Sequence, residues 1–257
     1  MSGSPDGVLG GGTPVPDELV RRARALAVPG RRAVLGITGP PGAGKSTLAR
    51  ALVDVLGPER AVEVGMDGFH LSDAVLAAHG SRERKGAIDT FDDAGYAALV
   101  DRLADARPGD PPVYAPVFRR EIEEPVAAGV EVRADVPLVV TEGNYLLAAS
   151  GAWPRARARM AEVWYVDVPD DVRLARLTER HRAFGKSPDD AHRWARGSDQ
   201  ANADLIARTR DAADLLVVGE GRPPSGPGPD PLRSSRPAGG RTGPRRLGGP
   251  ADAQRSR

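Results

Sequence analysis

A glycine-rich turn that ends in a lysine and two hydroxyl side chains lies within LGITGPPGAGKSTLAR, residues 35–50. Glycines let successive backbone N–H groups point at one anion, and a helix beginning there directs its positive end at the same point. A plain turn between a strand and a helix is the alternative, but the full G-x-x-x-x-G-K-[ST] spacing favours a phosphate site. We therefore expect a nucleotide triphosphate on the loop Gly39, Pro40, Pro41, Gly42, Ala43, Gly44, Lys45, Ser46 and Thr47, with the Ser46 hydroxyl as a Mg²⁺ ligand.

Two carboxylates occur where predicted strands end. Asp67 lies in VGMDGFHL and Glu142 lies in LVVTEGNYLL. In a parallel sheet, such strand ends open onto the same crevice as the phosphate loop. A carboxylate there can orient a hydroxyl and accept its proton, or bind the shell of a magnesium ion. Capping of a helix or a turn is the alternative for either residue alone, and their joint placement favours a site.

Basic residues give a second indication of phosphate chemistry. The chain uses arginine almost everywhere and has lysine only at Lys45, Lys85 and Lys186, the last two beside a glycine in polar segments. Where arginine is the default, a retained ammonium suggests that a compact, mobile charge is needed. A cluster on or beside a predicted helix could form a lid over transferring phosphates, and a solvated face paired with acidic neighbours is the alternative. Its members are Arg176, Arg180, Arg182 and Lys186.

Alternating strands and helices must position these residues. Short apolar, β-branched runs predict strands over 32–38, 61–66, 136–141, 162–168 and 214–218. Helices are predicted from Pro16 to residue 27 and over 46–56, 94–106, 170–183 and 188–209. This alternation is typical of an α/β fold with a parallel sheet covered on both faces. The proline-rich stretch 107–135 interrupts it and predicts an irregular or hairpin-bearing insertion.

Composition sets the limits of this domain. The tail 221–257 carries a charge of roughly +6 and is rich in Gly, Pro and Ser, so it is expected to be disordered, as are residues 1–15. One domain over 16–220 remains. The chain has no cysteine and therefore no disulfide, thiolate metal site or thiol nucleophile. We find no signal peptide and no apolar run of membrane-spanning length, and we expect a cytoplasmic protein with no membrane partner.

The order of these motifs resembles a known group of enzymes. The phosphate loop is followed by MDGFHL, RKGAIDTFD, VYAPVF, TEGNYLL and RHRAFGKSP. Over about residues 30–218 the chain resembles the P-loop kinases related to uridine kinase, phosphoribulokinase and bacterial pantothenate kinase. The resemblance implies a P-loop NTPase-type sheet with a small lid, and ATP- and Mg²⁺-dependent transfer of a phosphoryl group to a hydroxyl of a small metabolite, such as a nucleoside, a sugar or a pantothenate-like acceptor.

The resemblance also implies roles for individual residues. Asp67 corresponds to the catalytic base and Glu142 to the acidic, magnesium-binding Walker B-like position. Lys45 and Arg180 would act on the transferring phosphoryl group, with Lys186 in the lid beside the nucleotide. The acceptor would be bound by His70, Arg84, Lys85, Tyr114, Arg120 and Asn144. One position departs from the expected VYAPVFDR, because Arg119 stands where an acidic residue is expected.

Two other classes of function are a regulatory ATPase and a nucleic-acid-binding protein. A regulatory ATPase or nucleotide-dependent switch is the main alternative, although no N-K-x-D motif occurs and DDAG at 92–95 does not follow a predicted strand. A nucleic-acid partner has only the charge of the arginine-rich tail in its favour. The tail has no interleaved aromatic residues, so such a partner is not expected. Neither His70 nor His181 lies in a metal-ligand pattern, so hydrogen bonding to substrate or structure is expected of both. The sequence leaves a homodimer open.

Overall fold

The structure is a computed structural model that describes residues 8–9, 13–183, 185 and 187–219. Lys186, the predicted tail 221–257 and most of residues 1–15 lie outside the described residues. The helix predicted from Pro16 is confirmed as α1 (Asp17–Leu26), with Asp17 and Glu18 in its first turn.

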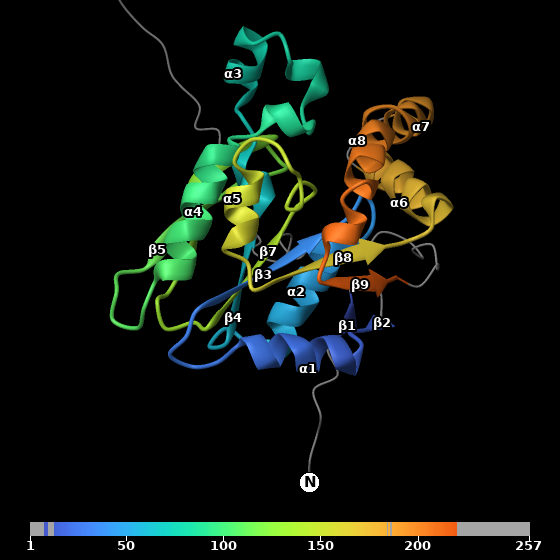
Figure 1. The fold of residues 1–257 in the computed structure, drawn as a ribbon. Helices are drawn as coiled ribbons and strands as arrows, with labels where there is room; N and C mark the ends of the chain where they lie inside the picture. The colour runs from blue at the N-terminus through green and yellow to red at the C-terminus, as the bar shows by residue number, and fades with distance from the viewer. Residues whose placement is uncertain (1–7, 10–12, 184, 186, 220–257) are drawn as a thin grey trace, which may run out of the picture. The chain divides into compact units, whose positions relative to one another are not determined.

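A five-stranded parallel sheet forms the centre of the fold (Figure 1). Its strands are β3 (Ala33–Thr38), β4 (Ala61–Gly65), β7 (Leu138–Glu142), β8 (Glu162–Asp167) and β9 (Leu215–Val218). They lie in the order β4-β7-β3-β8-β9, and every pair is parallel. The predicted α/β fold class is confirmed, and each of the five predicted strands is present with its ends within two residues of the prediction.

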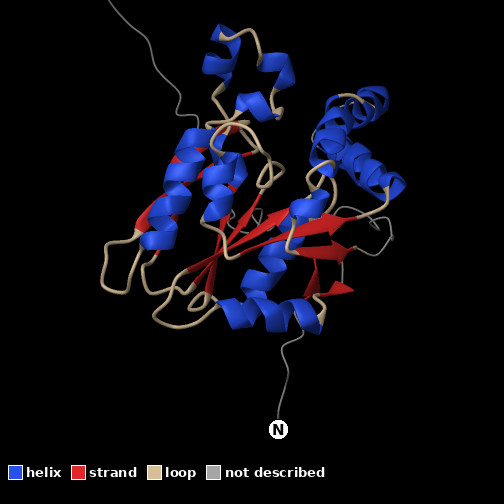
Figure 2. Cartoon of the chain, in the orientation of Figure 1, coloured by secondary structure: helices blue, strands red, loops and turns tan. Residues whose placement is uncertain are grey.

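Helices cover both faces of this sheet, as Figure 2 shows. On one face, α1 and α2 (Lys45–Leu56) pack in the core cluster that contains Leu35 of β3. On the other face, α4 (Asp93–Asp105) and α5 (Trp153–Ala158) pack in the cluster that contains Val34. Because side chains alternate along a strand, the apolar runs supply both faces. The short α5 was not predicted from the sequence.

The segments between the strands carry one hairpin and several short helical turns. The predicted insertion contains the antiparallel pair β5 (Val113–Arg119) and β6 (Glu124–Val132). We refer to β5, β6 and their connecting turn as the hairpin. Residues 66–90 contain four short helical segments that were not predicted from the sequence. They are η1 (Met66–Phe69), α3 (Asp73–Ala78), η2 (Arg82–Arg84) and η3 (Ile88–Thr90).

The helices after β8 differ in part from the prediction. Helix α6 (Asp170–Ala183) has the predicted bounds. The single helix predicted over 188–209 was wrong: the structure has α7 (Pro188–Arg196) and α8 (Ser198–Ala207), followed by η4 (Arg210–Ala212). Gly197 lies between them with φ −96° and ψ −101°, which is not a helical conformation. Glycine adopts such a conformation readily, so the helix breaks there.

The first residues that the structure describes form a short antiparallel pair of strands. β1 (Val8–Leu9) pairs antiparallel with β2 (Thr13–Pro14), so the expectation that residues 1–15 lack structure is wrong at these positions. None of the helices in the described ranges combines the length and the apolar character that crossing a bilayer would need.

Candidate active site

The phosphate loop connects β3 to α2. Gly42 has φ +83°, and a Cβ atom there would lie 2.7 Å from the backbone oxygen of Arg173 in α6. Gly44 has φ +97° and is the residue directly before the first residue of α2. Glycine is therefore needed at Gly42 both for the backbone conformation and for the close approach of α6. The result is a turn whose helix starts at Lys45, as the motif predicts.

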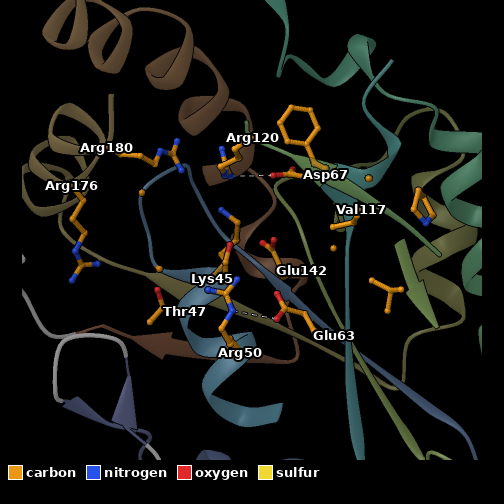
Figure 3. Close-up of a pocket in the computed structure, with 18 residues that line it drawn as sticks. Lys45, Thr47, Arg50, Glu63, Asp67, Val117, Arg120, Glu142, Arg176 and Arg180 are labelled. Atoms are coloured by element: carbon orange, nitrogen blue, oxygen red, sulfur yellow. Dashed lines mark ion pairs between the residues drawn. The ribbon is translucent and has the colours of Figure 1, made fainter. Parts of the chain in front are cut away.

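A cavity of about 620 Å³ opens at this loop and at the carboxyl ends of β4 and β7. Figure 3 shows Asp67 and Glu142 on one side of it and Arg176 and Arg180 on the other, with Lys45 between them. The loop and α2, β4 and η1, the hairpin, β7 and α6 all contribute to its wall. The lining residues are Gly42, Gly44, Lys45, Ser46, Thr47, Arg50, Glu63, Gly65, Asp67, Gly68, Pro116, Val117, Phe118, Arg120, Val130, Glu142, Arg176 and Arg180.

Lys45 and Glu142 are buried residues in the lining of the cavity, and their charges influence each other. Each residue is 8% exposed. The Lys45 ammonium donates a hydrogen bond to the Pro40 carbonyl oxygen at 3.1 Å. Burial lowers the pKa of Lys45, an effect that the charges of Glu142 and Asp67 oppose. Burial and the Asp67 charge raise the pKa of Glu142, while Lys45 and a hydrogen bond with Ser46 lower it. An additional cation beside Glu142 would favour its carboxylate form.

Ser46 and Glu142 are the residues suited to hold a metal here. A hydroxyl and a carboxylate offer the oxygen ligands that Mg²⁺ prefers, and Mg²⁺ is usually bound by one or two protein ligands together with water and substrate phosphates. Within the described ranges, no group of three His, Asp or Glu side chains is arranged to hold a metal ion. The residues present therefore fit a magnesium ion shared with a nucleotide better than a cage made by the protein alone.

Asp67 lies on η1, directly after β4, with its side chain 34% exposed. Its Oδ2 lies 3.6 Å from Nη2 of Arg120, and its Oδ1 lies 4.0 Å from Nε2 of His70. The carboxylate faces the same cavity as Lys45 (Figure 3). An acceptor hydroxyl bound between Asp67 and the phosphate loop would have a proton acceptor at hand.

The predicted basic cluster divides between two places. Arg176 and Arg180 line the cavity, and Arg176 Nη1 donates to the Ala43 carbonyl oxygen at 3.4 Å. Arg180 keeps an exposed side chain, yet the protein atoms around its guanidinium and the charge of Arg120 lower its pKa. Arg182 lines a separate hollow between α6 and α7. The fourth member, Lys186, lies outside the described residues.

His181 has a structural partner, as expected from its lack of a metal-ligand pattern. Its Nε2 lies 2.8 Å from Oδ2 of Asp199, so the contact joins α6 to α8.

Two of the predicted acceptor residues lie beside the cavity rather than in its lining. His70 is 10% exposed and stacks on Phe91 at 4.0 Å between ring centroids. Burial lowers its pKa to about 4. The Lys85 ammonium is 2.6 Å from Oδ1 of Asp73 and 3.9 Å from Oε2 of Glu124, so it joins the 66–90 segment to the hairpin.

Of the remaining acceptor predictions, Arg120 lines the cavity and Arg84, Tyr114 and Asn144 do not. Arg84 hydrogen-bonds Asp89 at 3.0 Å, Tyr114 is 51% exposed on β5, and the Asn144 backbone oxygen accepts from a threonine hydroxyl at 3.1 Å. None of the three is in the lining of the cavity formed by the described residues. Arg120 is in the lining, and its neighbour Arg119, which departs from the expected pattern, is exposed and outside it.

Sequence reasoning missed two charged lining residues and the apolar wall. Arg50 Nε lies 3.9 Å from Oε2 of Glu63, and both line the cavity below Lys45 (Figure 3). Glu63 had a detectable signal, since it is the one charged residue in the strand AVEVG. The apolar wall of the cavity comes from the hairpin, and the pairing of its two strands is seen only in the folded chain. The residues of this wall are Pro116, Val117, Phe118 and Val130.

Comparison with known proteins identifies the family of this chain. The model of the phosphoribulokinase / uridine kinase family matches residues 34–219. The "ATP-dependent kinase-like protein notR'" of Aspergillus versicolor is 37% identical over 165 residues, covering 61% of this chain and 95% of the relative. The "Putative uridine kinase C227.14" of Schizosaccharomyces pombe is 30% identical over 211 residues, covering 78% and 89%. A solved structure titled "putative fructose transport system kinase", from Silicibacter sp. TM1040, superimposes with a TM-score of 0.70 at 33% identity and covers 78% of this chain and 97% of its own. This chain therefore belongs to the phosphoribulokinase / uridine kinase family of ATP-dependent small-molecule kinases.

Proposed function

We propose that the chain transfers the γ-phosphoryl group of ATP to a hydroxyl of a small metabolite, with Mg²⁺ as cofactor. The observation that carries the proposal is that Asp67, Glu142 and Lys45 line one cavity with the phosphate loop. Phosphoryl transfer asks a protein mainly for positioning and for stabilisation of charge. The phosphate loop and the Asp67 carboxylate would position the two substrates. The cationic side of the cavity would stabilise the charge.

The donor half of the site consists of the loop and its neighbouring cations. The backbone N–H groups of the loop and the Lys45 ammonium would hold the ATP phosphates, and Arg176 and Arg180 would add positive charge from α6. Ser46 and Glu142 would hold the magnesium ion. When bound, Mg²⁺ supplies neutralisation of the negative charge on the phosphate oxygens.

The acceptor half is the space between Asp67 and the hairpin. The acceptor oxygen forms a bond to Pγ while the bond between Pγ and the bridging oxygen of ADP breaks. The hydroxyl proton passes to the Asp67 carboxylate, and ADP leaves with the electron pair of the broken bond. Asp67 thus acts as the general base, and Glu142 remains with the metal.

Relatives suggest which acceptors to test. The names of similar proteins mention uridine, pantothenate and a fructose transport system. We therefore extend the proposal to a nucleoside, a sugar or a pantothenate-like acceptor. A cytoplasmic location remains a prediction from the sequence, which leaves a homodimer open.

The test is a coupled assay of ADP release over a panel of nucleosides, hexoses, pantothenate and ribulose 5-phosphate. We expect at least one acceptor to raise ADP release above basal hydrolysis, with a phosphorylated product detected by mass spectrometry. If every acceptor leaves the rate at the basal value, the kinase proposal fails and the regulatory ATPase gains support.

A further inference from the structure

Arg120 is a cavity-facing guanidinium with few partners. It lies in the turn between β5 and β6, and its side chain is 46% exposed. Its nearest charged partner is Asp67 at 3.6 Å, and it donates no hydrogen bond to any residue that the structure describes. By contrast, the more exposed Arg82 hydrogen-bonds Asp73 at 2.8 Å and 3.1 Å. A guanidinium has five N–H donors, so Arg120 has donors to offer to an anion.

The wall around Arg120 is apolar. Pro116, Val117, Phe118 and Val130 line the cavity on the hairpin side. The neutral polar side chains in the lining are Ser46 and Thr47, and both belong to the phosphate loop. On this apolar wall, a neutral polyhydroxylated acceptor would find few hydrogen-bond partners, and each buried hydroxyl without one costs free energy. A compact acceptor with one charged group and one reactive hydroxyl suits the wall better.

The donor side does not need Arg120. Lys45 is fixed at the phosphate loop, and Arg176 and Arg180 reach the cavity from α6. Arg120 comes from a different element and lies beside Asp67, on the acceptor half (Figure 3). Its charge also lowers the pKa of Arg180, so the two guanidiniums are close enough to repel each other. An anion bound at Arg120 would relieve that repulsion.

We propose that Arg120 binds a carboxylate or phosphate group of the acceptor, and that the acceptor is therefore an anionic hydroxy compound. This inference rests on the proposed kinase function. An anion on Arg120 replaces Asp67 as its partner, because a bidentate contact is stronger than a pair at 3.6 Å. The Asp67 carboxylate is then free to accept the hydroxyl proton, so binding of the correct acceptor prepares the base.

The test compares acceptors that differ only in the anionic group. Suitable pairs are glycerol and glycerate, pantothenol and pantothenate, and fructose and fructose 6-phosphate. We expect ADP release with an anionic member and at least about tenfold lower kcat/KM with its neutral counterpart, as for loss of a charge-assisted hydrogen bond. The acid pairs and the phosphate pair show which kind of anion Arg120 binds.

Three variants locate the effect. Arg120→Gln should raise KM for the anionic acceptor about ten- to hundredfold and leave KM for ATP unchanged. Arg120→Lys keeps the charge but not the planar fork, so its KM should be intermediate. Arg119→Gln is the matched control, because it removes the same charge from an exposed neighbour outside the lining, and it should behave as the unaltered protein.

The outcomes separate this inference from the proposed function. Equal use of neutral and anionic acceptors, or equal KM values in Arg120→Gln and Arg119→Gln, overturns the anionic acceptor but leaves the kinase. A rise in KM for ATP alone places Arg120 on the donor side and also overturns it. If no acceptor of either kind is phosphorylated, both proposals fail together.

Discussion

At the scale of single residues, Asp67 carries the clearest prediction. Asp67→Asn keeps the shape of the side chain and removes its ability to take a proton. We expect kcat to fall by at least about a hundredfold, the lower range for loss of a general base. The affinity for ATP should stay nearly the same, because Asp67 lies across the cavity from the loop. Turnover and equilibrium nucleotide binding are the two measurements, and unaltered turnover would remove Asp67 from the role of base.

His70 predicts a pH dependence of stability. It stacks on Phe91, and burial lowers its pKa from 6.5 to about 4. Asp67 and Glu124 favour its protonation, while Lys85 and Arg120 oppose it. Between pH 6.5 and about 4, the unfolded chain binds a proton that the folded chain does not, so stability is lost as the pH falls through this window.

The variant His70→Phe measures this contribution while keeping an aromatic ring on Phe91. From pH 7 to pH 4, the free energy of unfolding of the unaltered protein should fall by up to about 3 kcal/mol more than that of the variant. Urea unfolding at several pH values is the measurement. His79→Asn, at an exposed position, is the control and should follow the unaltered protein. Parallel curves for all three proteins would show that His70 titrates normally.

At the scale of elements, the phosphate loop depends on the contact between α2 and α6. Gly42 and Gly57 bracket α2 and have similar positive φ values of 83° and 81°. A Cβ at Gly42 would lie 2.7 Å from the Arg173 backbone oxygen, whereas at Gly57 it would meet nothing within 4 Å. Alanine at either position is strained, because both φ values favour glycine, and ψ 160° at Gly57 belongs to a region that is essentially restricted to glycine. Gly42→Ala must in addition displace α6, and with it Arg176 and Arg180.

The two alanine variants therefore separate backbone strain from misplacement of the site. Both should lower the free energy of unfolding, because both replace a glycine at a positive φ. Only Gly42→Ala should lower kcat/KM for ATP, by at least about tenfold, since small misplacements at such a site cost large factors in rate. Steady-state kinetics beside thermal unfolding checks this. A Gly57→Ala protein with the same kinetic defect would mean that strain in α2, not α6, is responsible.

The helices and strands differ in how well they could be predicted from the sequence. The strands and α6 were predictable, because apolar β-branched runs and cap residues act locally. The break at Gly197 was missed because the flanking residues favour a helix on both sides. In the site, the loop, Asp67 and Glu142 were predictable because strand ends of a parallel sheet converge. The wall that contains Val130 was not, since the pairing of β5 with β6 brings together residues distant in sequence.

At the scale of the whole molecule, charge is unevenly distributed along the chain. The segment after Gly221 carries roughly +6 and the rest roughly −5, although the total is only +1. Every lining residue of the cavity lies between Gly42 and Arg180, and the family model ends at residue 219. The basic segment is thus separate in sequence from the residues that line the cavity.

Removal of residues 222–257 tests whether this separation is also functional. We expect the truncated protein to keep the kcat and both KM values of the full chain, because each proposed site residue is retained. Any binding of DNA or RNA, measured by fluorescence anisotropy at low salt, should be lost, since the body that remains has the same sign of charge as nucleic acid. A truncated protein with reduced turnover at an unchanged melting temperature would contradict this expectation and would assign the basic segment a part in the phosphoryl transfer.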